Sequence, residues 1–302
     1  MSFRYLGAII SKNPPTVTAP VDGEGGSASG AWSIASQANY QALGTWPKPL
    51  LSGYLWSWGM NNRGQLGLGN ITYYSSPKQV GALTAWSKIS GGGESSIAIK
   101  SDGTLWTWGR NASGQLGLGS TVSKSSPNQV GALTTWSSIV SGYTYTLAIK
   151  TDGTLWSWGS NNVGQLGLGN TTYYSSPKQV GSLTTWAKAT GNIFQTIAVK
   201  TDGTLWSWGW NANGQLGLGN TTDYSSPKQV GALTTWLNVA CGSYFSSATK
   251  TDGTLWSWGN NAYGQLGLGN LTNYSSPKQV GALTAWAKIA TSNGTIIAIK
   301  TS

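Results

Sequence analysis

Short runs of alternating apolar and polar residues recur along residues 53–302 with a period of 50 residues. The clearest run reads Leu-Trp-Ser-Trp-Gly, with Thr in place of Ser in one copy, and it begins at Leu55, Leu105, Leu155, Leu205 and Leu255. A repeat of this length is a structural unit that buries its apolar face only by stacking on copies of itself. The pattern therefore predicts one repeat domain.

One repeat, taken as residues 86–135, is expected to form four β-strands. Alternating runs at 86–90, 97–100 and 104–108 predict three of them, and Pro127 marks an outer strand, where no ladder donor is needed. Asp102 and Gly103 lie between the second and third runs, which favours a type I′ hairpin turn. Four antiparallel strands per repeat are typical of a propeller blade. The predicted fold is all-β, a five-bladed β-propeller of four-stranded antiparallel blades.

The two ends of the repeat region predict how the ring closes. The first copy lacks the two strands that precede the Leu-Trp run elsewhere, and residues 286–300 supply two such strands with no Leu-Trp run after them. We expect the C-terminal strands to pair with the first blade, which removes both free edges. The predicted propeller covers residues 51–302. Residues 1–50, rich in Pro, Gly, Ser and Thr, are predicted to be an attachment arm with an extended part and a short helix over 32–43.

Composition narrows the chemistry. Charged residues make up 9% of the chain, there is no His, and the single Cys241 permits no internal disulfide. Without imidazole and without paired acids, we predict no enzymatic activity, no metal site and no cofactor. No apolar run is long enough for a membrane span. Fifteen of the 18 Trp lie at equivalent repeat positions, so they are interpreted as blade core.

Positions that differ between near-identical copies are the candidates for recognition. They cluster in the loop after the first strand and in the turn after the third strand, and these two connections emerge at the same end of an antiparallel blade. The Asp-Gly turns lie at the other end, from which the arm leaves. The candidate binding residues are Arg63, Arg110, Tyr143, Tyr145, Phe194, Trp210, Tyr244, Phe245 and Tyr263. Large aromatic side chains are enriched in binding surfaces, whereas neutral drift in solvated loops is the alternative interpretation.

The formal net charge of +10 comes largely from lysines repeated once per blade. Two series stand out, Lys100, Lys150, Lys200, Lys250 and Lys300, and Lys78, Lys178, Lys228 and Lys278. Such a ring is compatible with an acidic partner or a polyanion. Because Asp follows two residues after the lysine in four blades, nucleic acid is not an expected partner.

The motif Trp-Gly-x-Asn-x-x-Gly-Gln-Leu-Gly-x-Gly stands at residues 58–69, 108–119, 158–169, 208–219 and 258–269. It resembles the repeat of the regulator of chromosome condensation family. This resemblance implies a β-propeller closed by a shared blade. The family's best-known member has seven blades, exchanges nucleotide on a small GTPase and touches chromatin, and other members are secreted inhibitors that bind an enzyme through one propeller face.

Ser-Ala-Ser-Gly-Ala-Trp-Ser at 27–33 and Gly-Thr-Trp-Pro at 44–47 look like the opening of virion and tail proteins of aquatic bacteriophages. The leading hypothesis is therefore a phage virion protein, a tail-fibre, tail-tip or capsid-surface component. Its arm, with Phe3, Tyr5, Trp32 and Trp46, would bind other virion proteins, and its propeller a host surface glycan or protein. The alternative is a cytoplasmic or secreted propeller that binds a protein partner, by GTPase exchange or enzyme inhibition. A homo-oligomer is compatible with either.

Overall fold

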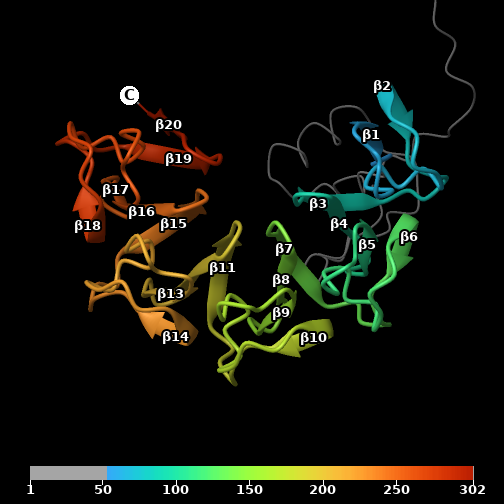
Figure 1. Cartoon of the computed structure of the whole chain (residues 1–302), viewed down its shortest axis with the longest axis horizontal. Coiled ribbons are helices and arrows are strands. Elements are labelled where there is room, and N and C mark those ends of the chain that lie inside the picture. Colours follow the sequence, from blue (N-terminus) through green and yellow to red (C-terminus); the bar gives the residue numbers. More distant parts are fainter. Residues whose placement is uncertain (1–52, 302) are drawn as a thin grey trace, which may run out of the picture. The chain divides into compact units, whose positions relative to one another are not determined.

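The computed structural model describes residues 53–301, which form twenty β-strands and no helix (Figure 1). The predicted arm and its binding residues Phe3, Tyr5, Trp32 and Trp46 lie outside the described residues. Within the described part, no helix is long and apolar enough to cross a membrane. The all-β prediction is confirmed.

The strands fall into four repeat positions. First strands are β3 (Trp86–Gly91), β7 (Trp136–Ser141), β11 (Trp186–Gly191), β15 (Trp236–Cys241) and β19 (Trp286–Thr291). Second strands are β4 (Ser95–Lys100), β8 (Tyr145–Lys150), β12 (Gln195–Lys200), β16 (Phe245–Lys250) and β20 (Ile296–Lys300). Third strands are β1 (Trp56–Gly59), β5 (Leu105–Gly109), β9 (Leu155–Gly159), β13 (Leu205–Gly209) and β17 (Leu255–Gly259). Fourth strands are β2 (Tyr74–Gln79), β6 (Lys124–Gln129), β10 (Tyr174–Gln179), β14 (Tyr224–Gln229) and β18 (Tyr274–Gln279).

Four complete antiparallel blades follow one another along the chain, β3–β6, β7–β10, β11–β14 and β15–β18. The same register recurs in each, for example Ile149 opposite Leu155 and Leu147 opposite Ser157. Figure 1 shows the first strand of each blade on the inner side of the arc and the fourth strand on the outer side. The four-stranded blade is therefore confirmed.

The Asp-Gly hairpin forms, but not as a type I′ turn. Gly103 has φ +76°, whereas Asp102 is absent from the residues of positive φ. The Lys100 amide donates a hydrogen bond to Thr104 O at 3.0 Å, so the loop between these two residues contains three residues. This is the three-residue hairpin with glycine in the left-handed position. Asp102 instead accepts hydrogen bonds from the amide and hydroxyl of Thr104, at 2.9 and 2.6 Å.

Blades are joined by a repeated tryptophan contact. Trp158 is fully buried, and its Nε1 donates to Gln115 O of the preceding blade at 2.9 Å. A Cβ on Gly117 would lie 2.7 Å from this Nε1, so glycine is needed for the close approach. Trp136 packs edge-on against Trp158 with ring centroids 6.1 Å apart. In the complete blades, the tryptophans that open the first strand and close the third strand are thus core residues, as predicted.

The predicted closing sheet is not formed within the described residues. β20 pairs only with β19 and β1 pairs only with β2, so two half-blades remain at the ends of the arc. Trp58 is 59% exposed and Ile297 is 70% exposed, although their equivalents in complete blades are buried. Gly267, the equivalent of Gly117, has Val280 rather than a tryptophan as its neighbour. The contact that joins consecutive blades is therefore missing here.

Candidate functional site

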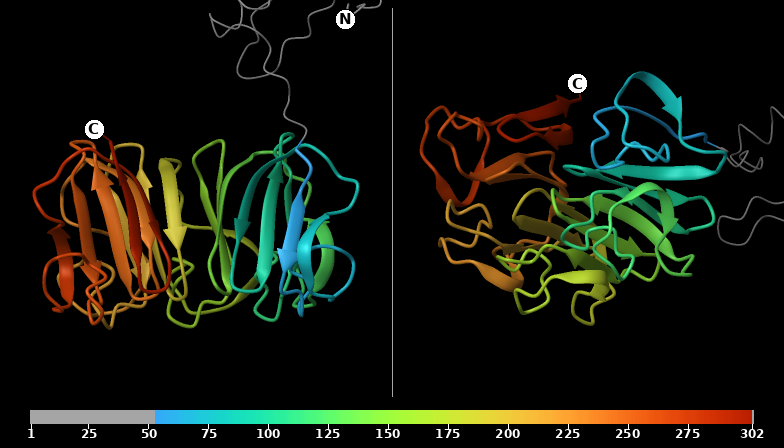
Figure 2. Two further views of the ribbon diagram at one scale, coloured as in Figure 1. Left: turned by 90° about the horizontal axis from the view of Figure 1, so that it is seen from above. Right: turned by 45° about the vertical axis from the view of Figure 1, so that its right-hand side comes forward.

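Backbone hydrogen bonds establish the two ends of the blades. After the third strand, the amide of Arg110 donates to Glu94 O at 2.8 Å, and that of Trp210 donates to Phe194 O at 3.0 Å. These bonds join the two variable connections at one end, which we call the variable face. At the other end, the Thr151 amide donates to Thr135 O at 2.8 Å and joins the Asp-Gly turn to the crossover. We call this end the uniform face; the strands run between the two faces in the left view of Figure 2.

Three of the predicted residues form an aromatic cluster across two blades. Trp210 follows β13, and its ring lies edge-on between Phe194 and Tyr244, with centroid distances of 6.0 and 5.3 Å. Phe194 belongs to the same blade as Trp210, whereas Tyr244 belongs to the next blade. Tyr244 is 39% exposed, and the other two rings are half-buried. The variable face therefore carries a partly exposed apolar surface held by neighbouring loops.

Two other predicted residues form a charged cluster on the same face. Arg110 Nη1 lies 2.6 Å from Glu94 Oε2, and Arg63 Nε lies 3.9 Å from the same oxygen. Arg63 comes from the β1–β2 half-blade and Arg110 from blade β3–β6. Because two guanidinium groups face one carboxylate, the cluster has an excess positive charge.

Tyr143 and Tyr263 are exposed but do not join either cluster. The Tyr143 amide donates to Asn192 O at 2.8 Å, and its ring covers Gly93 of the preceding blade. Tyr263 is 87% exposed. Tyr143 thus contacts the blade before it and the blade after it, whereas Tyr263 is an isolated exposed side chain.

The prediction is wrong for Tyr145 and Phe245, which are both fully buried. Tyr145 donates its hydroxyl to Gln195 O at 2.6 Å, and burial raises the pKa of this phenol. A Cβ on Gly191 would collide with the Tyr145 hydroxyl, and one on Gly242 would collide with the Phe245 ring. Tyr145 fills space between two blades, whereas Phe245 packs against the loop of its own blade. The signal in the sequence was glycine at the contacting loop positions.

Lysines of the uniform face are held by aromatic rings. Lys150 Nζ lies 3.8 Å from the ring centroid of Trp156, and Lys200 Nζ lies 3.7 Å from that of Trp206. Desolvation lowers the pKa of Lys200, and the charge of Asp202 opposes that shift. Lys200 is only 8% exposed, and Lys100 and Lys250 also lie near tryptophan rings, whereas Lys300 is exposed.

The carboxylates of the described residues have structural partners. Hydrogen bonds from Thr104, Thr154, Thr204 and Thr254 lower the pKa of the turn residues Asp102, Asp152, Asp202 and Asp252. Asp223 Oδ1 accepts from the Asn211 amide at 2.7 Å. Within residues 53–301, no group of three His, Cys, Asp or Glu side chains is placed to hold a metal. The arrangement on the variable face is suited to binding.

Repeated four-stranded antiparallel blades, with one uniform and one variable face, define a β-propeller. Regulator of chromosome condensation (RCC1) repeats match residues 52–99, 102–149, 152–193, 202–249 and 252–299. The chain belongs to this RCC1 repeat family. A second RCC1 repeat signature matches residues 86–115, 136–165 and 236–265.

Solved structures show the same fold. Human WBSCR16 has a TM-score of 0.73 at 22% identity, with 82% of this chain and 67% of that chain covered. Prp20p of Saccharomyces cerevisiae, in a study of its binding to Gsp1p and histones, has a TM-score of 0.71 at 20% identity, with 83% and 65% covered. Yeast RCC1 (Prp20) bound to Kap60 has a TM-score of 0.73 at 20% identity, with 83% and 63% covered. The chain thus spans about two thirds of these proteins. No curated protein sequence matches it.

Proposed function

We propose that this chain is a non-enzymatic binding protein that recognises a protein partner through its variable face. The aromatic cluster of Phe194, Trp210 and Tyr244 carries the proposal. Each ring sits at a position where the other blades have different residues, yet the three contact one another across a blade boundary. Large, partly exposed aromatic side chains supply contact area at low entropic cost.

The charged cluster adds a second contact of different chemistry. Glu94 holds Arg110 and Arg63 on two consecutive blades, so their guanidinium groups are positioned before a partner binds. Arginine positioned in this way favours a carboxylate on the partner. The partner's complementary surface therefore combines an apolar side chain with an acidic group.

The comparisons support the protein-binding alternative better than the virion hypothesis. Prp20p is studied for binding to Gsp1p and histones, which are proteins, and at 20% identity this likeness shows the fold. A more specific form of this proposal is that the partner is a GTPase whose nucleotide exchange the chain promotes, or an enzyme that it inhibits, in the cytoplasm or after secretion. Virion attachment through residues 1–50 and binding of a host glycan stay predictions, because the arm lies outside the described residues.

The test replaces the cluster by residues that another blade already carries. The triple variant Phe194→Thr, Trp210→Ser and Tyr244→Thr copies Thr144 and Ser160 of blade β7–β10. The control Leu271→Thr removes a 66%-exposed apolar side chain and copies Thr221.

The full chain and both variants are used as baits with lysate of the source cells. Each protein enriched by the full chain is then purified and its affinity measured. We expect a partner that binds the full chain and the control equally and the triple variant at least about tenfold more weakly. Equal binding to the triple variant would refute the proposed face. Recovery of virion proteins through residues 1–50 would instead favour the phage hypothesis.

A further inference from the structure

One repeat position on the inner strands carries charge in alternate blades. Two residues after the buried tryptophan of each first strand, the side chains are Lys88, Ser138, Lys188, Asn238 and Lys288. These strands lie on the inner side of the arc (Figure 1). A hollow of about 330 Å³ there is lined by Ser138, Lys188, Asn238 and Lys288, together with Ala189, Val239, Ala287 and Ile289. We call this hollow the inner channel; Lys188 and Lys288 line it, whereas Lys88 occupies the same repeat position on β3 outside its lining.

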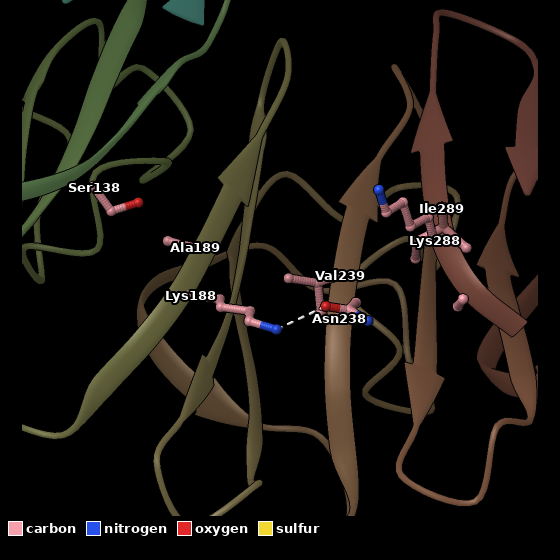
Figure 3. Close-up of a pocket in the computed structure, with 8 residues that line it drawn as sticks. Ser138, Lys188, Ala189, Asn238, Val239, Lys288 and Ile289 are labelled. Atoms are coloured by element: carbon pink, nitrogen blue, oxygen red, sulfur yellow. Dashed lines mark hydrogen bonds between the residues drawn. The ribbon is translucent and has the colours of Figure 1, made fainter. Parts of the chain in front are cut away.

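The contacts of these lysines leave their charge uncompensated. Lys188 Nζ donates to Leu237 O at 2.9 Å and to Asn238 Oδ1 at 2.7 Å, as Figure 3 shows for the second bond. Lys88 Nζ donates to Ser137 O. All of these acceptors are neutral, and the five first strands contain no Asp or Glu. In the described residues, ion pairs form only at Glu94.

The other repeated lysines are different in this respect. In the four complete blades, those of the uniform face lie over tryptophan rings and two residues before an Asp. The series on the fourth strands lies over tyrosine rings, as in Lys178 over Tyr174 at 5.4 Å. Lys88, Lys188 and Lys288 have no such ring among the cation–π contacts of the described residues. Their positive charge is therefore available to a ligand.

Like charges that converge on a confined space raise its electrostatic potential and concentrate anions there. An ammonium group binds phosphate as a compact point charge. The Ser138 hydroxyl and the Asn238 amide add donors beside the lysines. An anion with several charges satisfies more than one lysine at once, whereas chloride satisfies one.

We infer that the inner channel binds a small multivalent oxyanion, bearing phosphate or carboxylate groups, through Lys188 and Lys288. The site is separate from the aromatic and charged clusters of the variable face. It therefore does not depend on the proposed protein partner.

The natural repeats supply matched variants. Lys188→Asn with Lys288→Asn copies Asn238 at the same position, so the blades should accept it. Lys178→Asn with Lys278→Asn copies Asn128 and removes the same charge from the fourth strands. Ser138→Lys adds a third lysine to the lining of the channel.

Binding of sodium pyrophosphate and of citrate to the full chain is measured by calorimetry at a constant ionic strength of about 0.15 M. We expect the Kd to rise at least about tenfold in the channel variant and to change less than about twofold in the fourth-strand control, a separation typical of a local charged contact. Ser138→Lys should lower the Kd. A glutamate-rich peptide is titrated in parallel to distinguish a peptide ligand.

Three results would overturn the inference. Pyrophosphate and citrate both failing to bind the folded full chain would do so. An equal loss of affinity in the channel variant and in the fourth-strand control would also overturn it, because that result would indicate nonspecific charge attraction. Binding of the glutamate-rich peptide without binding of either small anion would show that the channel takes a peptide instead.

Discussion

Trp158 and Trp58 occupy the same position of the third strand, and replacing each by Ala compares a closed blade junction with an open one. Trp158 is fully buried, donates to Gln115 O at 2.9 Å and packs against Trp136 at a centroid distance of 6.1 Å. Trp58 is 59% exposed, and no full blade precedes it among the described residues. Both substitutions remove the same side chain. The difference between their effects on the free energy of unfolding therefore measures what the closed blade junction contributes.

Removing a buried tryptophan destabilises by about 3–5 kcal/mol, from lost apolar burial and the cavity left behind. Surface substitutions usually change stability by less than about 0.5 kcal/mol, and a side chain about 40% buried lies between these limits. We therefore expect Trp158→Ala to cost about 3 kcal/mol or more and Trp58→Ala about 1 kcal/mol. For a domain of this size, each kcal/mol corresponds to about 2–4 °C in Tm.

Guanidinium unfolding followed by far-UV circular dichroism measures both costs without relying on the fluorescence of the substituted residue. Equal slopes with different midpoints would assign the difference to stability. A cost for Trp58→Ala as large as that for Trp158→Ala would refute the open junction. It would show that the β1–β2 half-blade is covered in solution as completely as the others.

Two further predictions concern single residues of the blades. Gly191→Ala should destabilise the fold by about 1–3 kcal/mol by overpacking against Tyr145. Gly91→Ala should be nearly neutral, because no atom outside its chain neighbours lies within 4 Å of its added Cβ. Denaturation midpoints measure both effects, and the additional substitution Tyr145→Ser should relieve the cost of Gly191→Ala. Hydrogen bonds from threonine hold the pKa values of the turn carboxylates, including Asp152, below the ordinary value of 3.8. Their stabilisation is therefore present above that pH and lost as pH falls through the lower folded-state pKa. The free energy of unfolding should therefore fall between pH 5 and pH 2. Replacing all four aspartates by Asn should reduce the slope of unfolding free energy against pH, and an unchanged slope would contradict the assignment.

The strand order and blade type could be predicted because they depend on local patterns. Leu155 and Trp158 recur with their neighbours in every repeat, and the hairpin before them brings the second strand alongside. Ring closure depends instead on the step between blades. The Gly117–Trp158 contact sets this step, and no strand pattern encodes its angle.

The structure leaves candidate residues inside the loops at least partly exposed and buries Tyr145 and Phe245 at the loop edges. Tyr244 and Phe245 are neighbours, but Phe245 is the first residue of β16 and points into the interior. Side chains alternate in direction along a strand, so an error of one residue in its start exchanges exposed for buried. The channel lysines alternate with neutral residues, so a pattern shared by every blade does not single them out. The alternation of Lys88, Ser138 and Lys188 was visible in the same comparison of copies.

Differences between the repeats therefore have at least two physical origins. At Tyr145 and Gly191 the differences are paired across a blade boundary, because a large ring in one blade requires a missing side chain in the next. Such pairs make each junction specific to its two blades, which neutral change in solvated loops does not explain. At Phe194, Trp210 and Tyr244 the difference is again shared by two blades, but the rings stay partly exposed. The paired difference at Tyr145 and Gly191 is explained by packing within the folded chain. The aromatic cluster instead leaves apolar surface exposed, where we propose that a partner binds.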